Sequence, residues 1–404
     1  MPFILITVLI DMLSVGLIIP VLPLLVGTFT TSQAEQAYWF GAVMFAFAIA
    51  NFFGSPILGA LSDRYGRRPV LLLGFAGLGL SFFVTAVATA IWMLILVRLF
   101  SGALMANAAV ANAYVADITA PADRARRFGL LGAMFGVGFI LGPVLGGLLG
   151  AVDLRLPFYA AGFLAMLNLA YGTFVLPESL PRERRTPFEW RRANPVAALK
   201  GLAGLKGVGW LVLVLALSAL AQFVLHSTWV LYTAFKFGWG PLENGWSLFA
   251  VGLMSALVQG FLLKHLLHRF SVQRLAVMGL VSSSLCYLAW GLAPTGWVMF
   301  VVIGFNVLGF AVNAAMQSIV SNAAGETIQG RTMGALSSLN SLMAVAAPVI
   351  GAALLGFVSH LPQGDWRIGA PYYFCAALQA AAALIALRHF ARARATPFLH
   401  PAQT

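Results

Sequence analysis

Two ionisable side chains lie inside long apolar stretches of the amino-terminal half: Asp11, within the first stretch, and Arg98, within the fourth. A charge in a hydrocarbon environment costs several kcal/mol and usually faces a cavity or a partner. We therefore hypothesise that the two approach each other, with Asp11 gaining and losing a proton and Arg98 tuning its acidity. A fixed ion pair that never titrates is the alternative interpretation.

Other side chains suit a binding chamber. His226 titrates in a useful pH range and is a third candidate for proton coupling, although a satisfied structural histidine fits equally well. The candidate substrate contacts are polar or aromatic residues within apolar stretches, each of which could instead serve interhelical packing: Asn51, Gln222, Trp229, Gln259, Asn313 and Gln317.

The sequence favours no enzyme. It contains no nucleophile–base pair within the apolar stretches, and neither Cys286 nor Cys375 belongs to a metal-ligand cluster or a disulfide framework. There is no G-x-x-x-x-G-K-[ST] phosphate-binding motif, so the energy for any transport must come from a gradient. We expect no catalytic residues, no metal and no cofactor.

The composition is that of a membrane protein. Hydrophobic residues make up 61% of the 404 residues and charged residues only 9%, and the mean hydropathy is +0.91. A spanning helix needs about 20 mostly apolar residues, and the runs are too long for strands. The first run is interpreted as a retained span rather than a signal peptide. Twelve runs qualify: 3–29, 37–61, 69–90, 92–116, 128–150, 156–177, 208–235, 245–267, 274–293, 296–322, 332–358 and 370–390.

Charge predicts the orientation. Of the 24 Lys and Arg residues, the odd-numbered connections carry only Arg155, Lys236 and Arg367, so the even-numbered connections and both termini should face the cytoplasm. The net charge of +12 shows no basic face of the kind that binds nucleic acid.

The chain also divides into two similar halves. A polar stretch after the sixth run predicts a six-helix bundle over 1–178, a cytoplasmic linker over 179–206 and a second bundle over 207–404. Gly142-Pro143-x-x-Gly146 in the fifth run is repeated as Ala347-Pro348-x-x-Gly351 in the eleventh, which suggests two parallel repeats.

The connection after the second run carries the most specific motif. It reads G-x-L-S-D-R-x-G-R-R-P over 59–69 and resembles the signature of the major facilitator superfamily at every defined position. The resemblance implies that Asp63 docks near the amino terminus of the eleventh helix, predicted over 332–358 in the opposite half, and so holds the outward-open state. An ordinary charged loop is the alternative. The candidate gating residues here are Gly59, Asp63, Arg64, Gly66, Arg67 and Arg68.

The fifth run has glycines at helical spacing around a proline. Its pattern, G-x₈-G-x₃-G-P-x₂-G-G from residue 129, resembles the signature of drug/proton antiporters within the superfamily. Glycines allow close helix contact, and a proline permits a bend. Generic small-residue packing would use the same residues. The candidate gating residues are Gly138, Gly142, Pro143 and Gly146.

Over its whole length the chain resembles bacterial tetracycline/proton antiporters, through segments 6–23, 114–119, 124–129 and 142–147. The resemblance implies the major facilitator fold, with twelve helices in two six-helix bundles related by pseudo-two-fold symmetry. It also assigns roles in binding, coupling or gating to six positions: Asp11, Asn51, Asp63, Arg67, Arg98 and Gln259. Three positions depart from it, because Ser81, Ser255 and Ser283 stand where the family has acidic or histidine side chains.

These observations predict a monomeric, proton-coupled exporter of hydrophobic or amphipathic small molecules in the bacterial inner membrane. Its partners are then a small-molecule substrate, protons and the lipid bilayer, with no nucleic acid. A metabolite exporter or facilitator with weak or no proton coupling is the alternative that the three serines favour. A non-transporting receptor or scaffold is the alternative from another class.

Overall fold

The computed structural model describes residues 2–120, 123–190, 194–195, 209–324 and 329–395, and this part of the chain is helical with no strand. The helices of the first half are α1 (Pro2–Ile18), α2 (Leu22–Gly27), α3 (Gln33–Tyr65), α4 (Arg67–Ala86), α5 (Ile91–Leu104), α6 (Asn107–Asp117), α7 (Arg124–Val152) and α8 (Leu156–Phe174). Those of the second half are α10 (Gly209–Phe237), α11 (Pro241–Leu257), α12 (Leu263–Arg269), α13 (Val272–Leu292), α14 (Gly296–Phe305), α15 (Val307–Ala324), α16 (Gln329–Val358) and α17 (Ala370–Ala395). A π-helical segment, Val258–Leu262, joins α11 to α12.

Local sequence features determine where several of these helices begin, end or are interrupted. Ser32 caps α3 by accepting a hydrogen bond from the backbone N–H of Glu35. Gly66 separates α3 from α4 with φ of 110°, a conformation that side-chain-bearing residues rarely adopt. Within the first predicted span, the helix is interrupted between Ile18 and Leu22, at Pro20.

Ten helical stretches of the described chain are long and apolar enough to cross a membrane, and the pair α14–α15, bent by 48°, would be an eleventh. Each predicted run coincides with helix, but α8 is not among these ten, so the predicted count of twelve is not confirmed. The all-helical membrane architecture is confirmed. Most of the predicted linker, and with it the boundary at residue 206, lies outside the described residues.

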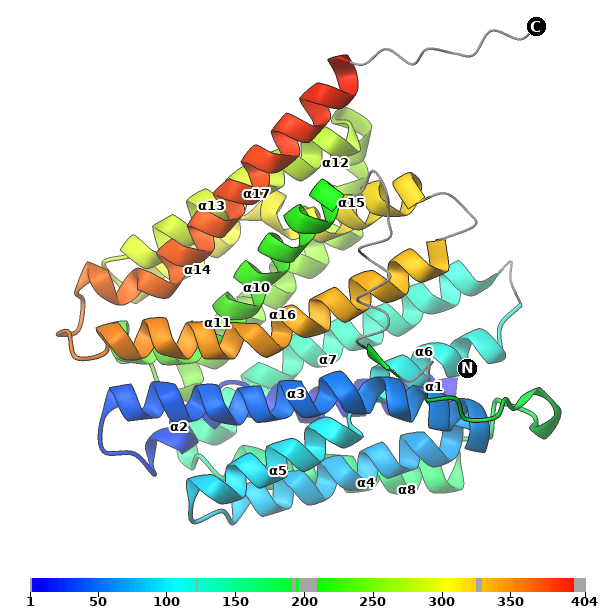
Figure 1. The fold of residues 1–404 in the computed structure, drawn as a ribbon. Helices are drawn as coiled ribbons and strands as arrows, with labels where there is room; N and C mark the ends of the chain where they lie inside the picture. The colour runs from blue at the N-terminus through cyan, green and yellow to red at the C-terminus, as the bar shows by residue number, and fades with distance from the viewer. Residues whose placement is uncertain (1, 121–122, 191–193, 196–208, 325–328, 396–404) are drawn as a thin grey trace, which may run out of the picture.

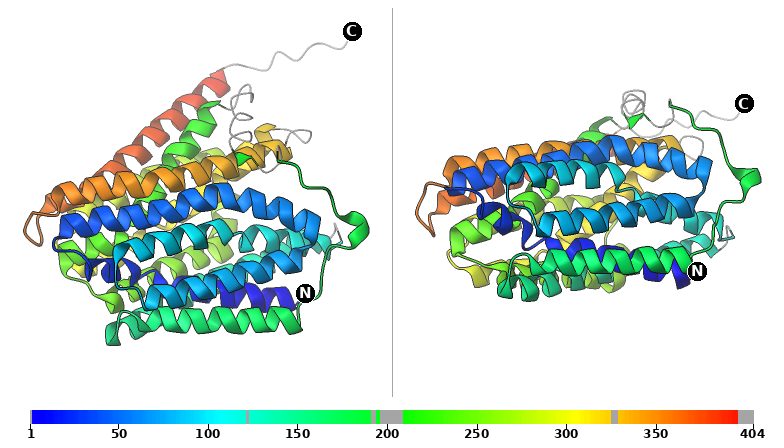
Figure 2. Two further views of the ribbon diagram at one scale, coloured as in Figure 1. Left: turned by 60° about the horizontal axis from the view of Figure 1, so that its bottom comes forward. Right: turned by 90° about the horizontal axis from the view of Figure 1, so that it is seen from below.

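The helices form two groups, α1 to α8 and α10 to α17, which diverge toward the side that carries both termini (Figures 1 and 2). They meet through α7 against α11 and α3 against α16. At these meeting points the backbones are close: a Cβ on Gly245 would lie 2.6 Å from the carbonyl oxygen of Pro143, and one on Gly252 would lie 2.7 Å from the side chain of Ile140.

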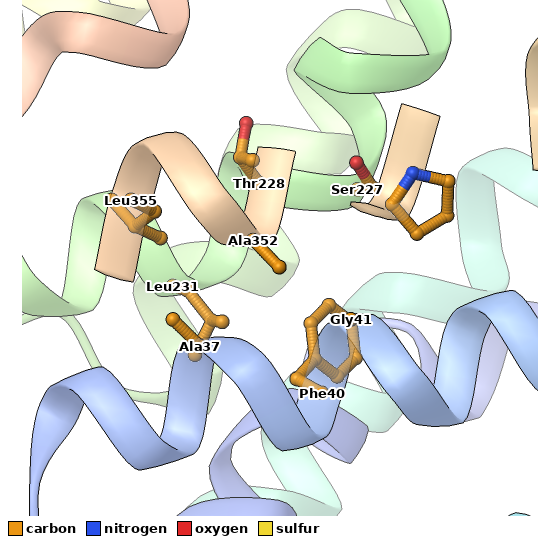
Figure 3. Close-up of a pocket in the computed structure, with 9 residues that line it drawn as sticks. Ala37, Phe40, Gly41, Ser227, Thr228, Leu231, Ala352 and Leu355 are labelled. Carbon is orange, nitrogen blue, oxygen red and sulfur yellow. The ribbon is translucent and has the colours of Figure 1, made fainter. Parts of the chain in front are cut away.

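Figure 3 shows one part of this contact between the halves. A pocket there is lined by residues of α3, α10 and α16, but its cavity of about 10 Å³ has room for at most about one water molecule. Its lining residues include Phe40, Leu231, Pro348 and Leu355. We infer that this end of the molecule is closed in the present conformation.

The other end is open. Gly129, Gly132 and Gly136 of α7 have no atoms within 4 Å of the position where a Cβ would stand, and the same holds for Gly260 in the π-helical segment and Gly334 of α16. These glycines lie toward the termini, whereas the tightly packed glycines of the same helices lie toward the closed end. The structure is therefore open on the side of the termini.

The loop between α16 and α17 is held by an exposed ion pair. Arg367 donates from Nη2 to Oδ2 of Asp365 at 2.7 Å, and these hydrogen bonds lower the pKa of Asp365 to about 2. An acid with a lowered pKa stabilises the fold above its unfolded pKa, near 3.9, and loses that contribution as the pH falls through the folded value. Asp365→Asn should therefore lower the melting temperature slightly at pH 6, and the difference from the wild type should shrink as the pH approaches 2. A constant difference across that range would contradict this assignment.

Candidate functional site

Asp11 lies on α1 and is only 4% exposed. Its Oδ1 accepts a hydrogen bond from Nδ2 of Asn107 at 3.0 Å, and Asn107 is itself 5% exposed. Asn107 is the first residue of α6, so the buried carboxylate is joined to the beginning of a short helix. The amino-terminal end of a helix is electropositive, which suits an anionic neighbour.

The helix break before Asn107 is stabilised from α3. α5 ends at Leu104 and α6 begins three residues later, with Met105 at ψ of 81°. Such a break leaves carbonyl groups without helical partners. Asn51 donates its Nδ2 to the carbonyl oxygen of Met105 at 2.6 Å and, more weakly, to that of Gly102 at 3.4 Å. The structure thus gives Asn51 a backbone partner where the sequence predicted a substrate contact.

This contact predicts a stability effect. Asn51→Leu would leave the carbonyl of Met105 without its donor, which should cost about 1–3 kcal/mol of unfolding free energy. Asn112→Leu is the matched control, because the Asn112 amide only bonds the carbonyl of Ala108 on its own helix and is exposed. Thermal melting of the purified variants checks this, and equal melting temperatures for the two would refute the role of Asn51.

Arg98 does not join Asp11, contrary to the sequence hypothesis. It is 9% exposed on α5, its guanidinium carbon lies 5.8 Å from the ring centroid of Phe47, and its Nη2 has no hydrogen-bond partner. Asp11 has Asn107 as its hydrogen-bond partner instead. The charges within apolar runs predicted that Asp11 and Arg98 lie inside the membrane region, but they did not predict the partners of these residues. Asn107 follows a helix break that the spacing of apolar residues does not reveal.

The second half contributes a polar wall. Asn313 of α15 donates its Nδ2 to Oε1 of Gln222 on α10 at 3.1 Å, and Gln317 lies one helical turn after Asn313. Asn313 and Gln317 line a cavity of about 260 Å³. His226 lies one turn after Gln222 on α10, and it is exposed. The structure therefore brings together three of the predicted substrate contacts.

Trp229 and Gln259 lie elsewhere. Trp229 is 3% exposed, donates its Nε1 to Oγ of Ser247 at 2.9 Å and packs edge-on against Trp290, so the prediction that it contacts substrate is wrong in this conformation. An aromatic residue in a spanning helix is as suitable for the core as for a cavity wall, and sequence alone does not separate the two. Gln259, in the π-helical segment, donates to Oγ of Ser255 at 2.7 Å on the open side.

Of the three serines that depart from the antiporter pattern, Ser81 bonds within its own helix, to the carbonyl of Gly77 at 2.7 Å. Ser255 accepts from Gln259, and Ser283 is 2% exposed. None supplies a titratable group.

The signature connection forms a network inside the first half. Arg67 pairs with Asp63 through Nη1 and with Asp117 through Nε at 3.0 Å, and it also donates to Oγ of Ser62. Glu178, just after α8, accepts hydrogen bonds from the backbone N–H groups of Arg67 and Arg68. Asp117 and Glu178 were not predicted from the sequence, although acidic side chains close to an arginine-rich loop are the expected partners of its guanidinium and N–H groups.

The predicted contact of Asp63 with the beginning of the eleventh run, which is α16 in the structure, is absent from the described contacts of Asp63, whose ion-pair partner is Arg67. Residues 325–328, just before α16, lie outside the described residues. Arg64 is exposed and lies over the ring of Tyr65 at 5.1 Å, and a Cβ on Gly59 would meet nothing within 4 Å. Among the described residues, no contact of Asp63 joins the two halves.

The glycines of α7 pack on α1. A Cβ on Gly142 would lie 2.6 Å from Cα of Gly16, and one on Gly138 would approach Met12 of the same helix. A Cβ on Gly146 would come still closer to the backbone of Leu17, and Pro143 lies within α7 beside these contacts. The predicted close helix face is confirmed, and it brings α7 against the helix that carries Asp11.

The described residues contain no group of three or more His, Cys, Asp or Glu side chains that could hold a metal ion. The geometry instead provides a buried carboxylate beside a helix break in one half and an uncharged polar cavity in the other. Together with the closed and open ends, this arrangement suits a protein that moves a small molecule rather than one that transforms it.

Comparisons with known proteins agree. Residues 4–348 match the family model of the Major Facilitator Superfamily. The chain is 36% identical over 391 residues to the class C tetracycline resistance protein of Escherichia coli, covering 96% of each chain, and 33% identical over 370 residues to the class D protein of Salmonella ordonez, covering 91% and 93%.

Among solved structures, the nucleoside transporter NupG superposes with a TM-score of 0.78 at 14% identity, covering 96% of this chain and 98% of its own. The human organic anion transporter MFSD10 superposes with a TM-score of 0.70 at 24% identity, covering 95% and 98%. These likenesses establish the fold. The chain is a multi-pass membrane transporter, not an enzyme, and it belongs to the major facilitator superfamily.

Proposed function

We propose that the protein is a proton-coupled exporter of hydrophobic or amphipathic small molecules that works by alternating access. The proposal depends above all on the buried pair of Asp11 and Asn107. A carboxylate accepts the amide hydrogen of Asn107, whereas a protonated carboxyl becomes a donor at one oxygen. Proton uptake therefore changes the hydrogen bonding at the beginning of α6.

The arrangement supplies a route from protonation to movement. Asp11 is on α1, which packs on α7 through the glycine contacts, and α7 in turn packs on α11 of the other half. A change of charge at Asp11 thus acts on the helix that joins the two halves. Gly138, Gly142, Pro143 and Gly146 are the proposed bending and contact residues of this connection.

Orientation and gating complete the proposal. The distribution of positive charge favours both termini and the open end facing the cytoplasm, in the inner membrane of a bacterium. We take the protein to act as a monomer. When the halves close at that end, Asp63 exchanges part of its contact with Arg67 for the beginning of α16, where the helix dipole favours a carboxylate. The proposed substrate contacts are Gln222, Asn313 and Gln317, with His226 beside them.

The relatives support the direction and class of transport. The similar proteins named tetracycline resistance proteins suggest efflux of an amphipathic compound. A facilitator with weak coupling is the second candidate, because Ser81, Ser255 and Ser283 provide no acid or imidazole in the places where the antiporter pattern has them.

Transport into sealed vesicles distinguishes the proton-coupled exporter from the facilitator. Purified protein is reconstituted, a pH gradient is imposed, and accumulation of tetracycline and of other amphipathic antibiotics is compared with and without the gradient. We expect accumulation against a concentration gradient only when the pH gradient is present. Equal initial rates and no accumulation in either condition would favour the facilitator.

A further inference from the structure

The end of the α11–α12 span carries a cluster of basic side chains. Four of them lie on α12 and the fifth lies in the first turn of α13: Lys264, His265, His268, Arg269 and Arg274. All five are exposed, and none forms an ion pair with a described residue. We call these five residues the α12 basic cluster, and it lies on the side of the molecule that carries both termini (Figure 1).

The α12 basic cluster has no acidic residues close to it along the chain. Residues 244–325 contain neither Asp nor Glu. Glu243 stands in the first turn of α11, at the opposite end of the same span. Glu326 lies outside the described residues, and its single charge would offset only one of the three Lys and Arg side chains. The cluster is therefore net positive.

The length of the span places the cluster at the level of the lipid headgroups. The span runs from Pro241 to Arg269 and has 29 residues. At about 1.5 Å per residue it is about 43 Å long, whereas the hydrocarbon core of a bilayer is about 30 Å thick. With its apolar part centred in the membrane, the last turns of this span therefore reach the layer of phosphates.

A hollow of about 370 Å³ lies within this end of the span. Its lining alternates between polar and apolar side chains: Gln259, Leu263, Lys264, Leu267 and His268. Close by, Phe261 is 71% exposed, so a large apolar ring also stands on this surface without cover. Cationic side chains match a phosphate, and exposed apolar side chains match acyl chains. The combination fits an anion that is also amphiphilic.

The neighbouring half does not cover the hollow. Nearer the closed end, Gly252 of α11 packs on Ile140 of α7, where a Cβ would lie 2.7 Å from the isoleucine side chain. Gln259 follows Gly252 by seven residues, two helical turns further toward the open end. There Gly132 and Gly136 of α7 have no atom within 4 Å of a Cβ position, and no residue of α7 lines the hollow. The hollow is thus free to receive a ligand in this conformation.

We propose that the hollow binds the headgroup of an anionic phospholipid from the adjacent leaflet. Its phosphate accepts hydrogen bonds from Lys264 and His268, and its acyl chains lie against Leu267 and Phe261. Basic pockets of spanning helices at this depth suit anionic headgroups. A soluble phosphate would satisfy the cations but would leave Leu267 and Phe261 uncovered, which favours the lipid. The assignment requires neither proton coupling nor a particular exported compound.

A fluorophore beside the hollow tests the proposal locally. Gly260→Cys provides the attachment point, because a Cβ there would meet no atom within 4 Å, while the native Cys286 and Cys375 are buried. The labelled full-length protein is titrated in mixed micelles with phosphatidylglycerol or phosphatidylcholine, each with brominated acyl chains that quench the label. We expect half-maximal quenching by phosphatidylglycerol at about one-fifth of the mole fraction needed for phosphatidylcholine.

Lys264→Gln combined with His268→Gln should remove this preference, and Lys264→Arg, which keeps the charge, should retain it. Arg388→Gln combined with His389→Gln is the matched control. It removes one arginine and one histidine that are exposed on α17 and lie outside the hollow, so the preference should persist. Size-exclusion profiles and melting curves verify that each variant is folded.

Three results would overturn the assignment. The first is equal quenching by the two lipids in the labelled protein without further substitution. The second is a preference for phosphatidylglycerol that survives the Lys264→Gln and His268→Gln pair. The third is loss of quenching when glycerol 3-phosphate is added in excess, because the ligand would then be a soluble phosphate rather than a lipid.

Discussion

Asp11→Asn is expected to abolish pH-driven accumulation of substrate while leaving exchange of substrate across the membrane intact. The carboxamide keeps the size of the side chain and a carbonyl that can accept from Asn107, but it cannot change its charge. With one proton exchanged per substrate, a gradient of one pH unit supports an accumulation ratio of up to about tenfold. The variant should show a ratio close to one.

The measurement is uptake into reconstituted vesicles, with and without the gradient, beside exchange of labelled for unlabelled substrate. Asp153→Asn is the matched control, since Asp153 is an exposed acid just beyond α7 and should leave both activities unchanged. If Asp11→Asn vesicles accumulated substrate as strongly as the wild type, Asp11 would have no part in coupling.

Gly142→Val is expected to destabilise the protein severely. A Cβ at this position would stand 2.6 Å from Cα and 2.9 Å from the carbonyl carbon of Gly16, and both are backbone atoms that cannot rotate away. Overpacking a core costs about 1–3 kcal/mol, and a clash between two backbones should reach the upper end or exceed it. We expect a lowered yield of folded protein and a melting temperature reduced by at least roughly 5 °C.

Gly132→Val on the same helix is the control. No atom lies within 4 Å of a Cβ at Gly132, so the added methyl groups meet open space and the change in stability should stay within about 1 kcal/mol. Melting curves of the two purified variants, measured in one detergent, make the comparison. Equal losses of stability would contradict the close approach of α1 and α7.

The architecture was predictable because membrane helices are specified by simple rules. The length of each apolar run, the clustering of arginines between runs and the glycine spacing in α7 all depend on the bilayer or on helix geometry. They predicted the helices and a close helix contact along the glycine face of α7, although not that α1 is its partner. The count was less secure, because α8, a helix of 19 residues, is not among the helices that are long and apolar enough to cross a membrane, and because α14 and α15 meet at a bend.

The partners within the site were not predictable from the sequence. Asp11 was expected to contact Arg98, but its hydrogen-bond partner is Asn107, which follows an interruption of the helix. The interruption, between Leu104 and Asn107, contains neither the glycine nor the proline that usually marks such a break in a sequence. Trp229 was expected in the cavity and lies in the core instead. Tertiary packing decides which face of a spanning helix contacts its neighbours. When a helix is apolar on all sides, its sequence pattern does not reveal that face.

In the present conformation, the burial of Asp11 limits its exchange of protons with water. At 4% exposure its carboxyl group is nearly sealed, whereas the cavity lined by Asn313 and Gln317 in the other half is open. We therefore expect proton exchange to require the alternative arrangement of α1 and α7, in which the glycine contacts at the closed end separate. Substrate and proton would then have access to the protein in different conformations, as exchange transport requires.

Proton movement accompanying transport tests the central claim most directly. Vesicles that contain wild-type protein and an internal pH-sensitive dye receive substrate on one side only, with no imposed pH gradient. The account predicts a change of internal pH as substrate enters, in the direction of proton exit, and no such change with Asp11→Asn. Substrate entry without proton movement in the wild type, or an unchanged proton signal in the variant, would contradict it.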